Sequence, residues 1–299
     1  MSGKTGAEGD RPARRAHVAY ALAVVTMLAA CGDLAPAQPR APAFGTSLFA
    51  ATADRHWGLP DRLKEVSGLA AQRDGRLIGH DDEKAVISVI DVNGGQLVKS
   101  FSLGDPALAG DFEGIAVGED DAIYMINSTG RLYRFAEGEN DAHVPFQTFE
   151  TGLAPVCEIE GLAYHAAAQS LIIACKINHA KAMRKTVSLY AWSVATRTLA
   201  PEPWLTASST RLAATAKVEG FHPSSVEIDP ATGRVILLAA REGAMAELNP
   251  DGSIVAARRL DPSHNQAEGV AILPDGALVI ADEGASGLRA GISRYPRRP

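Results

Sequence analysis

The sequence predicts an all-β fold: a β-propeller of five blades, with six as the alternative count, each blade a four-stranded antiparallel meander. A short phrase recurs along the chain, and short β-branched or aromatic runs alternate with turn residues. No window of helical length in the body carries an amphipathic stripe. Repeats of roughly 40–50 residues that each hold one β-meander are typical of propellers. A closed ring also leaves only short, protected strand edges.

The recurring phrase has the pattern acidic residue, glycine, hydrophobic residue, alanine. Its clearest copies are Asp111–Ala116 (DFEGIA), Glu158–Ala163 (EIEGLA) and Gln266–Ala271 (QAEGVA), and its looser copies are Glu65–Ala70 (EVSGLA) and His222–Glu227 (HPSSVE). The positions before the glycine are 46, 47, 64 and 44 residues apart along the chain. The interval of 64 residues predicts an insertion near residues 181–217.

Each phrase is followed by a tight turn and by further short strands. In the last unit, residues 269–273 precede the turn Pro274–Gly276, and a second apolar run covers residues 277–281. Pro-Asp-Gly and similar sequences tolerate the positive φ angles of hairpin turns. Third strands are expected at residues 130–135, 188–192, 244–248 and 291–295. A β-sandwich is the competing fold, but it would not repeat one phrase at this period.

The N-terminal residues predict export and a lipid anchor. Residues 1–30 join a basic start to an apolar stretch too short to span a bilayer, which ends in the sequence LAAC at Cys31. This ending resembles the lipobox of bacterial lipoproteins, which implies cleavage before Cys31 and a lipid on its thiol; an ordinary secretory signal is the alternative. Residues 31–45 are rich in proline and alanine and are expected to be a flexible tether. The propeller domain is expected over residues 46–299. Gly32 after the cysteine favours the outer membrane of the cell envelope over the inner one, with the protein facing the periplasm.

Charge and cysteine content narrow the partners and the compartment. The formal net charge of −6 and the pI of about 5.8 give no basic footprint, so nucleic acid is not an expected partner. Cys157 and Cys175 remain after Cys31 is assigned to lipid. In an oxidising periplasm they form a disulfide if the hairpin turn lies near Ala166, and two buried thiols are the equal alternative.

The residues before the glycines are expected to meet at one end of a central channel. They are Glu113, Glu160 and Glu268, with Ser67 and Ser224 in the looser copies. Carboxylates crowded together raise each other's pKa, and a cation relieves the repulsion. Calcium fits because it accepts six to eight oxygen ligands, whereas zinc and copper favour histidine and cysteine. A structural role for these glutamates, in caps or ion pairs, is the alternative.

A second ring of polar residues follows the next strand of each unit and is expected at the same mouth. Its members are Asp82, Asn127, Lys176, Glu242 and Glu283. Asp82 is its weakest member, because the run 81–83 is typical of a solvated turn. The further candidates at the mouth are Asp111, Lys176, His222 and Arg241. His222 stands at the position equivalent to Asp111 and is the candidate general base, but no catalytic residue is assigned.

The order of the phrases resembles the SdiA-regulated family of bacterial β-propellers, which is distantly similar to NHL-repeat proteins. The resemblance covers about residues 63–295 and is closest over Gln266–Ala271 and Glu160–Tyr164. It implies five blades and a bound calcium ion, and it carries the acidic positions of that pattern onto Glu113, Glu160, Glu242, Glu268 and Glu283. The chain departs from the pattern at Asn127 and Lys176, where acidic residues are expected.

Three functions are compatible with these observations. The first is a calcium-stabilised binding propeller, anchored to the membrane through Cys31, that binds a small molecule without catalysis. The second is a calcium-dependent hydrolase of phytase-like, esterase-like or lactonase-like type, in which the cation polarises a phosphoryl or carbonyl oxygen. The third is an interaction module for envelope proteins. Because the chain has no Gly-x-Ser-x-Gly elbow, we expect binding rather than catalysis.

Overall fold

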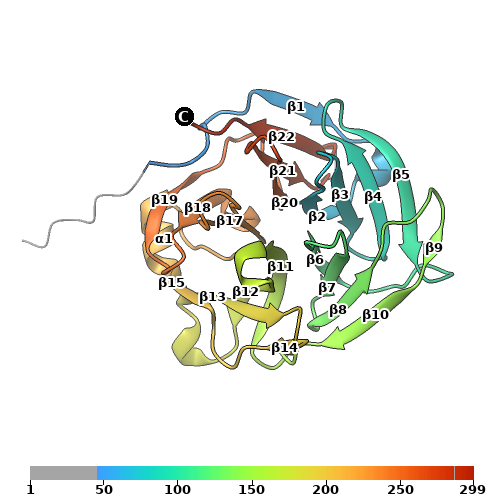
Figure 1. Cartoon of the computed structure of the whole chain (residues 1–299). Coiled ribbons are helices and arrows are strands. Elements are labelled where there is room, and N and C mark those ends of the chain that lie inside the picture. The colour runs from blue at the N-terminus through green and yellow to red at the C-terminus, as the bar shows by residue number, and fades with distance from the viewer. Residues whose placement is uncertain (1–45, 286) are drawn as a thin grey trace, which may run out of the picture. The chain divides into compact units, whose positions relative to one another are not determined.

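The computed structural model describes residues 46–285 and 287–299. Five antiparallel sheets surround a central axis as the blades of a five-bladed β-propeller (Figure 1). The prediction of five blades of antiparallel meanders is confirmed. The expected signal peptide, the tether and Cys31 lie outside the described residues. No helix in the part of the chain that the structure describes has the length and apolar character needed to cross a membrane.

The first three blades each start with an inner strand that carries a copy of the phrase. Blade 1 consists of β2 (Val66–Ala71), β3 (Leu77–Asp81), β4 (Val86–Asp91) and β5 (Gln96–Leu103). Blade 2 consists of β6 (Phe112–Val117), β7 (Ile123–Asn127), β8 (Arg131–Phe135) and β10 (Phe146–Glu150), while β9 (His143–Val144) pairs in parallel with β5. Blade 3 consists of β11 (Cys157–His165), β12 (Ser170–Asn178) and β13 (Thr186–Ser193), with β14 (Thr198–Leu199) and β15 (Leu205–Ser208) both beside β13.

The last two blades complete the ring. Blade 4 consists of β16 (Ser225–Ile228), β17 (Val235–Ala239), β18 (Ala244–Leu248) and β19 (Ile254–Arg259). Blade 5 consists of β20 (Ala267–Ile272), β21 (Leu278–Asp282), β22 (Gly291–Tyr295) and β1 (Arg55–Gly58). Short 3-10 helices are η1 (Asp61–Leu63), η2 (Ala166–Ala168), η3 (Lys181–Met183) and η4 (Ala240–Glu242). Because β1 pairs antiparallel with β22, the two ends of the domain close the ring through one sheet (Figure 1).

The predicted insertion contains a helix that periodicity did not reveal. Helix α1 (Ser209–Ala216) follows β15. The side chain of Ser208 caps its start by accepting a hydrogen bond from the backbone N–H of Arg211 at 3.3 Å. Three apolar side chains of α1 are buried in the core between blades 3 and 4: Leu212, Ala213 and Ala216. Tertiary packing therefore stabilises a helix that is too short to form alone.

The inner strands contact one another around the axis, and the glycines of the phrase lie at these contacts. A Cβ added to Gly114 on β6 would lie 2.5 Å from the backbone nitrogen of Leu162 on β11. A Cβ on Gly269 would lie 2.9 Å from the Cβ of Leu69 on β2. Non-bonded heavy atoms need about 3.5–4.0 Å, so only glycine permits this approach. The recurring glycine is therefore explained by the tight inner ring, and the apolar core fills the spaces between successive blades.

Candidate cation site

The residue before each of these glycines lies on a β-bulge. On β6, Phe112 pairs with Asn127 and Gly114 pairs with Ile126, so Glu113 is an extra residue without a partner. Glu268 on β20 is left over in the same way. Ser67 on β2 and the Glu160–Gly161 region of β11 also interrupt their registers. A bulge re-aims its extra side chain away from the regular alternation of the strand. The phrase therefore directs one side chain per bulged blade toward the end of the ring where the inner strands begin.

Several carboxyl groups gather at this end and raise each other's pKa. Burial raises the pKa of Glu113 to about 9, and the charges of Glu160 and Asp111 raise it further. Burial raises the pKa of Glu283 to about 8, with a contribution from Glu268. We call the group formed by these mutual influences the acidic cluster; its members are Glu65, Asp82, Asp111, Glu113, Glu160, Glu268 and Glu283. The structure thus brings together four of the five predicted ligands, and a cluster with raised pKa values is a functional-site candidate.

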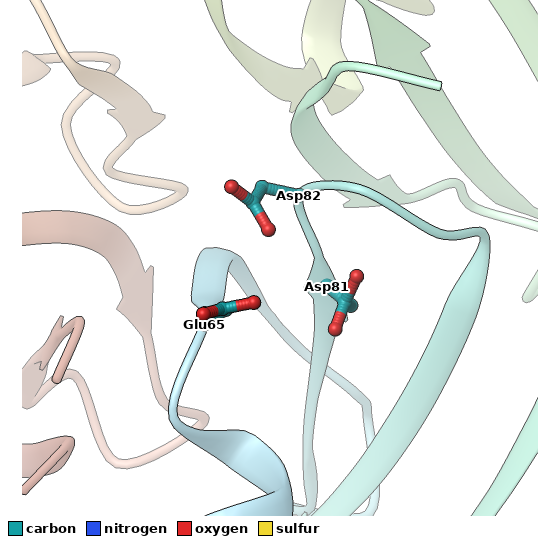
Figure 2. A group of neighbouring side chains, drawn as sticks. All are labelled: Glu65, Asp81 and Asp82. Atoms are coloured by element: carbon teal, nitrogen blue, oxygen red, sulfur yellow. The ribbon is translucent and has the colours of Figure 1, made fainter. Parts of the chain in front are cut away.

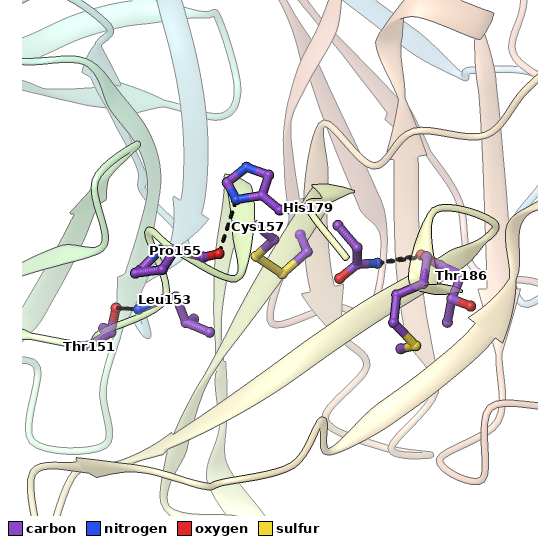
Figure 3. Close-up of a disulfide and its surroundings, with 9 residues drawn as sticks. Thr151, Leu153, Pro155, Cys157, His179 and Thr186 are labelled. Atoms are coloured by element: carbon purple, nitrogen blue, oxygen red, sulfur yellow. Dashed lines mark hydrogen bonds between the residues drawn. A yellow bond between two sulfur atoms is a disulfide. The ribbon is translucent and has the colours of Figure 1, made fainter. Parts of the chain in front are cut away.

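Lys176 compensates part of this negative charge. Its Nζ lies 2.5 Å from Oε1 of Glu160 and 3.5 Å from Oε1 of Glu158. Burial still raises the pKa of Glu160 to about 7, although the lysine opposes the shift. The ion pair belongs to β11 and β12, which a disulfide between Cys157 and Cys175 joins across the bulge (Figure 3). The disulfide therefore fixes the two strands that carry this pair.

The tightest group of acidic side chains involves residues that the sequence prediction ranked low or missed. Ligand oxygens of Glu65, Asp81 and Asp82 all lie within 4.8 Å of one another, the one such group of His, Cys, Asp or Glu in the described ranges (Figure 2). Asp81 Oδ1 accepts hydrogen bonds from the N–H groups of Glu83 and Lys84, as a turn residue does. Oδ1 of Asp82 is buried and has no hydrogen-bond partner among the residues described. Burial and the charge of Asp81 raise the pKa of Asp82.

A glutamine joins this group to the predicted glutamates. The amide of Gln266 donates a hydrogen bond of 2.9 Å to Oε1 of Glu268 and another to Oε2 of Glu283. The charges of Asp82 and Glu65 in turn contribute to the raised pKa of Glu283. Glu65 and Gln266 each stand two residues before the bulged position of their phrase, the place held by Asp111 in the second copy. Their repeated place is the signal in the sequence that could have found them.

The second predicted ring is only partly assembled at this end. The strand registers make Ser128, not Asn127, the equivalent of Asp82 and Glu283. Asn127 instead accepts hydrogen bonds from Thr129 and Arg131 at 2.8 Å and caps its own turn. The expectation that Asn127 belongs to the ring is therefore wrong by one residue, because sequence alone did not reveal the bulge.

Glu242, the remaining predicted ligand, contacts a histidine. Its Oε1 lies 2.8 Å from Nδ1 of His222, and its Oε2 accepts a hydrogen bond from the backbone N–H of His222 at 3.2 Å. Arg241 beside it keeps 74% of its side chain exposed. Because both oxygens of Glu242 are engaged, we leave it out of the ligand set proposed below.

Comparisons with known proteins support the fold. No family model and no curated protein matches the sequence. The structure is similar to glutaminyl cyclase from Myxococcus xanthus, with a TM-score of 0.55 and 14% identity over 84% of this chain and 98% of that chain. It is also similar to the PQQ-bound aldose sugar dehydrogenase from Streptomyces coelicolor, with a TM-score of 0.56 and 14% identity over 85% of this chain and all (100%) of that one. The WD40 repeats of RRP9 give a TM-score of 0.52 at 10% identity over 84% of this chain and 100% of theirs. At these identities the likeness shows a shared β-propeller fold, which hosts many unrelated functions.

Proposed function

We propose that the protein is a calcium-binding β-propeller of the SdiA-regulated type that acts as a ligand- or protein-binding module of the cell envelope. One observation carries the cation site. Glu65, Asp81 and Asp82 place their ligand oxygens within 4.8 Å of one another, and the buried Oδ1 of Asp82 has no partner in the described ranges. An unpartnered buried oxygen is costly unless a cation or water satisfies it.

The donor set fits calcium better than other metals. Every member of the acidic cluster offers carboxylate oxygens, which calcium prefers and which suit its loose geometry. Glu268 and Glu283 lie beside the Glu65–Asp81–Asp82 group and supply further oxygens. Zinc and copper favour imidazole or thiolate, and the acidic cluster contains neither. A bound cation would hold these carboxylates in their charged forms despite their burial.

Calcium is expected to stabilise the folded protein, which gives a direct test. Binding to the folded state alone contributes RT ln(1 + [L]/Kd), or about 2.7 kcal/mol at one hundred times Kd. For a domain of this size that is roughly 5–10 °C in the unfolding temperature. We would measure thermal unfolding of the purified protein in EDTA and then in excess calcium, with magnesium as the comparison ion.

A matched pair of variants locates the site. Asp82→Asn keeps the shape of the side chain but removes its charge, and it is expected to abolish most of the calcium shift. Glu139→Gln is the control, since Glu139 is exposed and lies outside the acidic cluster. A wild-type protein whose unfolding temperature does not respond to calcium would exclude the cation site. An equal response in both variants would exclude Asp82 as a ligand.

Membrane anchoring is the second part of this proposal, and it is supported by the sequence ending at Cys31. Expression with a labelled fatty acid is expected to label the wild-type protein, which should sediment with membranes. Cys31→Ser should lose the label and the membrane association. Labelling of Cys31→Ser at the wild-type level would refute the anchor.

A further inference from the structure

The insertion builds a second site whose residues lie outside the acidic cluster. Helix α1 ends at Lys217, and the segment Val218–Gly220 that follows forms one wall of a cavity of about 480 Å³. Arg259 at the end of β19 holds this wall, because its Nε and Nη2 donate hydrogen bonds to the carbonyl oxygen of Lys217 at 3.2 and 2.8 Å. The remaining lining consists of His222, Arg241, Glu242 and Arg259 itself.

A carboxylate–imidazole pair lies in the cavity wall. Glu242 keeps 8% of its side chain exposed and His222 keeps 34%. A carboxylate can only accept, so the 2.8 Å contact makes Nδ1 of His222 the donor and leaves the lone pair of the neutral ring on Nε2. The backbone hydrogen bond from His222 to the same carboxyl group fixes the ring orientation. This is the arrangement of a base held in one tautomer by a third group.

Close packing in the wall holds the pair in place. A Cβ added to Gly220 would lie 3.0 Å from Cε1 of His222 and 3.3 Å from Oε1 of Glu242. The inserted segment therefore packs directly on the imidazole and the carboxylate, with glycine as the residue that makes room. Nε2 of His222 has no hydrogen bond to any residue that the structure describes, and it is available to a ligand in the cavity.

We propose that this cavity is a general-base site that hydrolyses small carboxylic esters bearing a second, anionic carboxylate. Arg241 and Arg259 supply positive charge for the anionic group, since a guanidinium matches a carboxylate in geometry. The residues that line the cavity include no serine, threonine or cysteine. Water is therefore the nucleophile, and His222 is the catalytic residue, with Glu242 as its positioning residue.

The reaction balances without any other reagent. Nε2 of His222 takes a proton from water while the water oxygen bonds to the ester carbonyl carbon. Collapse of the tetrahedral intermediate breaks the bond to the alcohol oxygen, which receives the proton back from Nε2. Glu242 stabilises the imidazolium that exists between these steps. Calcium takes no part, so this inference does not depend on the proposed cation site, and either one can fail alone.

The test compares an anionic ester with a neutral one. We would follow release of nitrophenolate from the mono-4-nitrophenyl ester of glutaric acid and from 4-nitrophenyl butyrate, using the purified protein in EDTA. The anionic ester should be hydrolysed faster, and His222→Gln should lose on the order of 100-fold or more in kcat, as removal of a general base does. His179→Gln is the matched control, because His179 is exposed and bonds only to the carbonyl of Pro155 (Figure 3).

Two further variants keep the test decisive if His222→Gln folds poorly. Arg241→Gln changes a largely exposed side chain and should raise KM for the anionic ester alone. Glu242→Gln keeps an acceptor for Nδ1 but removes the charge, so it should lower kcat, leave KM unchanged and move the alkaline rise of the pH profile. Equal rates for the wild type and His222→Gln, equal KM effects on both esters in Arg241→Gln, or loss of activity in EDTA would each overturn the proposal.

Discussion

Replacing Gly114 by alanine is expected to lower the free energy of unfolding by about 2 kcal/mol. The new Cβ would lie 2.5 Å from the nitrogen of Leu162 and 2.9 Å from the carbonyl carbon of Gly161. Both are backbone atoms, so β6 and β11 would have to separate by roughly 1 Å to restore normal contacts. Overpacking of this kind costs about 1–3 kcal/mol, and the lower entropy of unfolded alanine returns about 0.4–1 kcal/mol.

Gly58→Ala is the matched control for this substitution. Gly58 also lies in a strand, β1, and a Cβ there would have no atom within 4 Å. Thermal unfolding in EDTA is the assay, and about 2 kcal/mol corresponds to a fall of roughly 4–8 °C. Gly58→Ala should be neutral or slightly stabilising. Equal unfolding temperatures for the two variants would refute the explanation of the recurring glycine as a residue of close approach.

Two further outcomes follow from the acidic cluster and the disulfide. In EDTA, the unfolding temperature should fall as pH rises from about 5 to 9, since burial raises the pKa values of Glu160, Glu283 and Glu113 to about 7, 8 and 9. The folded state binds more protons than the unfolded chain in this range, so stability present below the unfolded pKa is lost on ionisation; calcium should flatten the slope, and a rise with pH in EDTA would contradict this. Replacing Cys157 and Cys175 together by alanine should cost about 3 kcal/mol, because their 18-residue separation closes a loop in the unfolded chain; unfolding curves identical to those of the wild type would exclude this contribution.

The architecture was predictable because one physical constraint repeats five times. Each blade must bring an inner strand to the axis, and each tight contact needs a small residue at the same place in its unit. The spacing of the phrase therefore encodes the blade count directly. Helix α1 escaped prediction because eight residues are too few to show a helical period, and its apolar residues gain stability only against blades 3 and 4.

The site was predictable only where the repeat specifies it. The position before the glycine marks the bulge, so Glu113 and Glu268 could be placed from the sequence. Asp81 and Asp82 resembled a solvated turn, and Asp81 does cap that turn. Their approach to Glu65 depends on how β3 returns beside β2, which local pattern does not determine. The one-residue error at Asn127 has the same origin, because a bulge changes the register of every residue beyond it.

The fourth copy of the phrase shows how the two proposed sites separate. Its glycine position holds Ser225, and the pairing of β16 with β17 runs without a bulge from Ser225 to Ile228. Without a bulge, the residue before it is not directed toward the acidic cluster. Ser224 instead donates a hydrogen bond to the carbonyl of Ala267 and accepts one from the N–H of Ala240. The fourth blade therefore supplies no ligand at its phrase. Its polar residues, His222 and Glu242, pair with each other against the wall that the preceding insertion provides. Loss of the bulge and gain of the insertion together account for a ring that is acidic on one side and carries an oriented imidazole on the other.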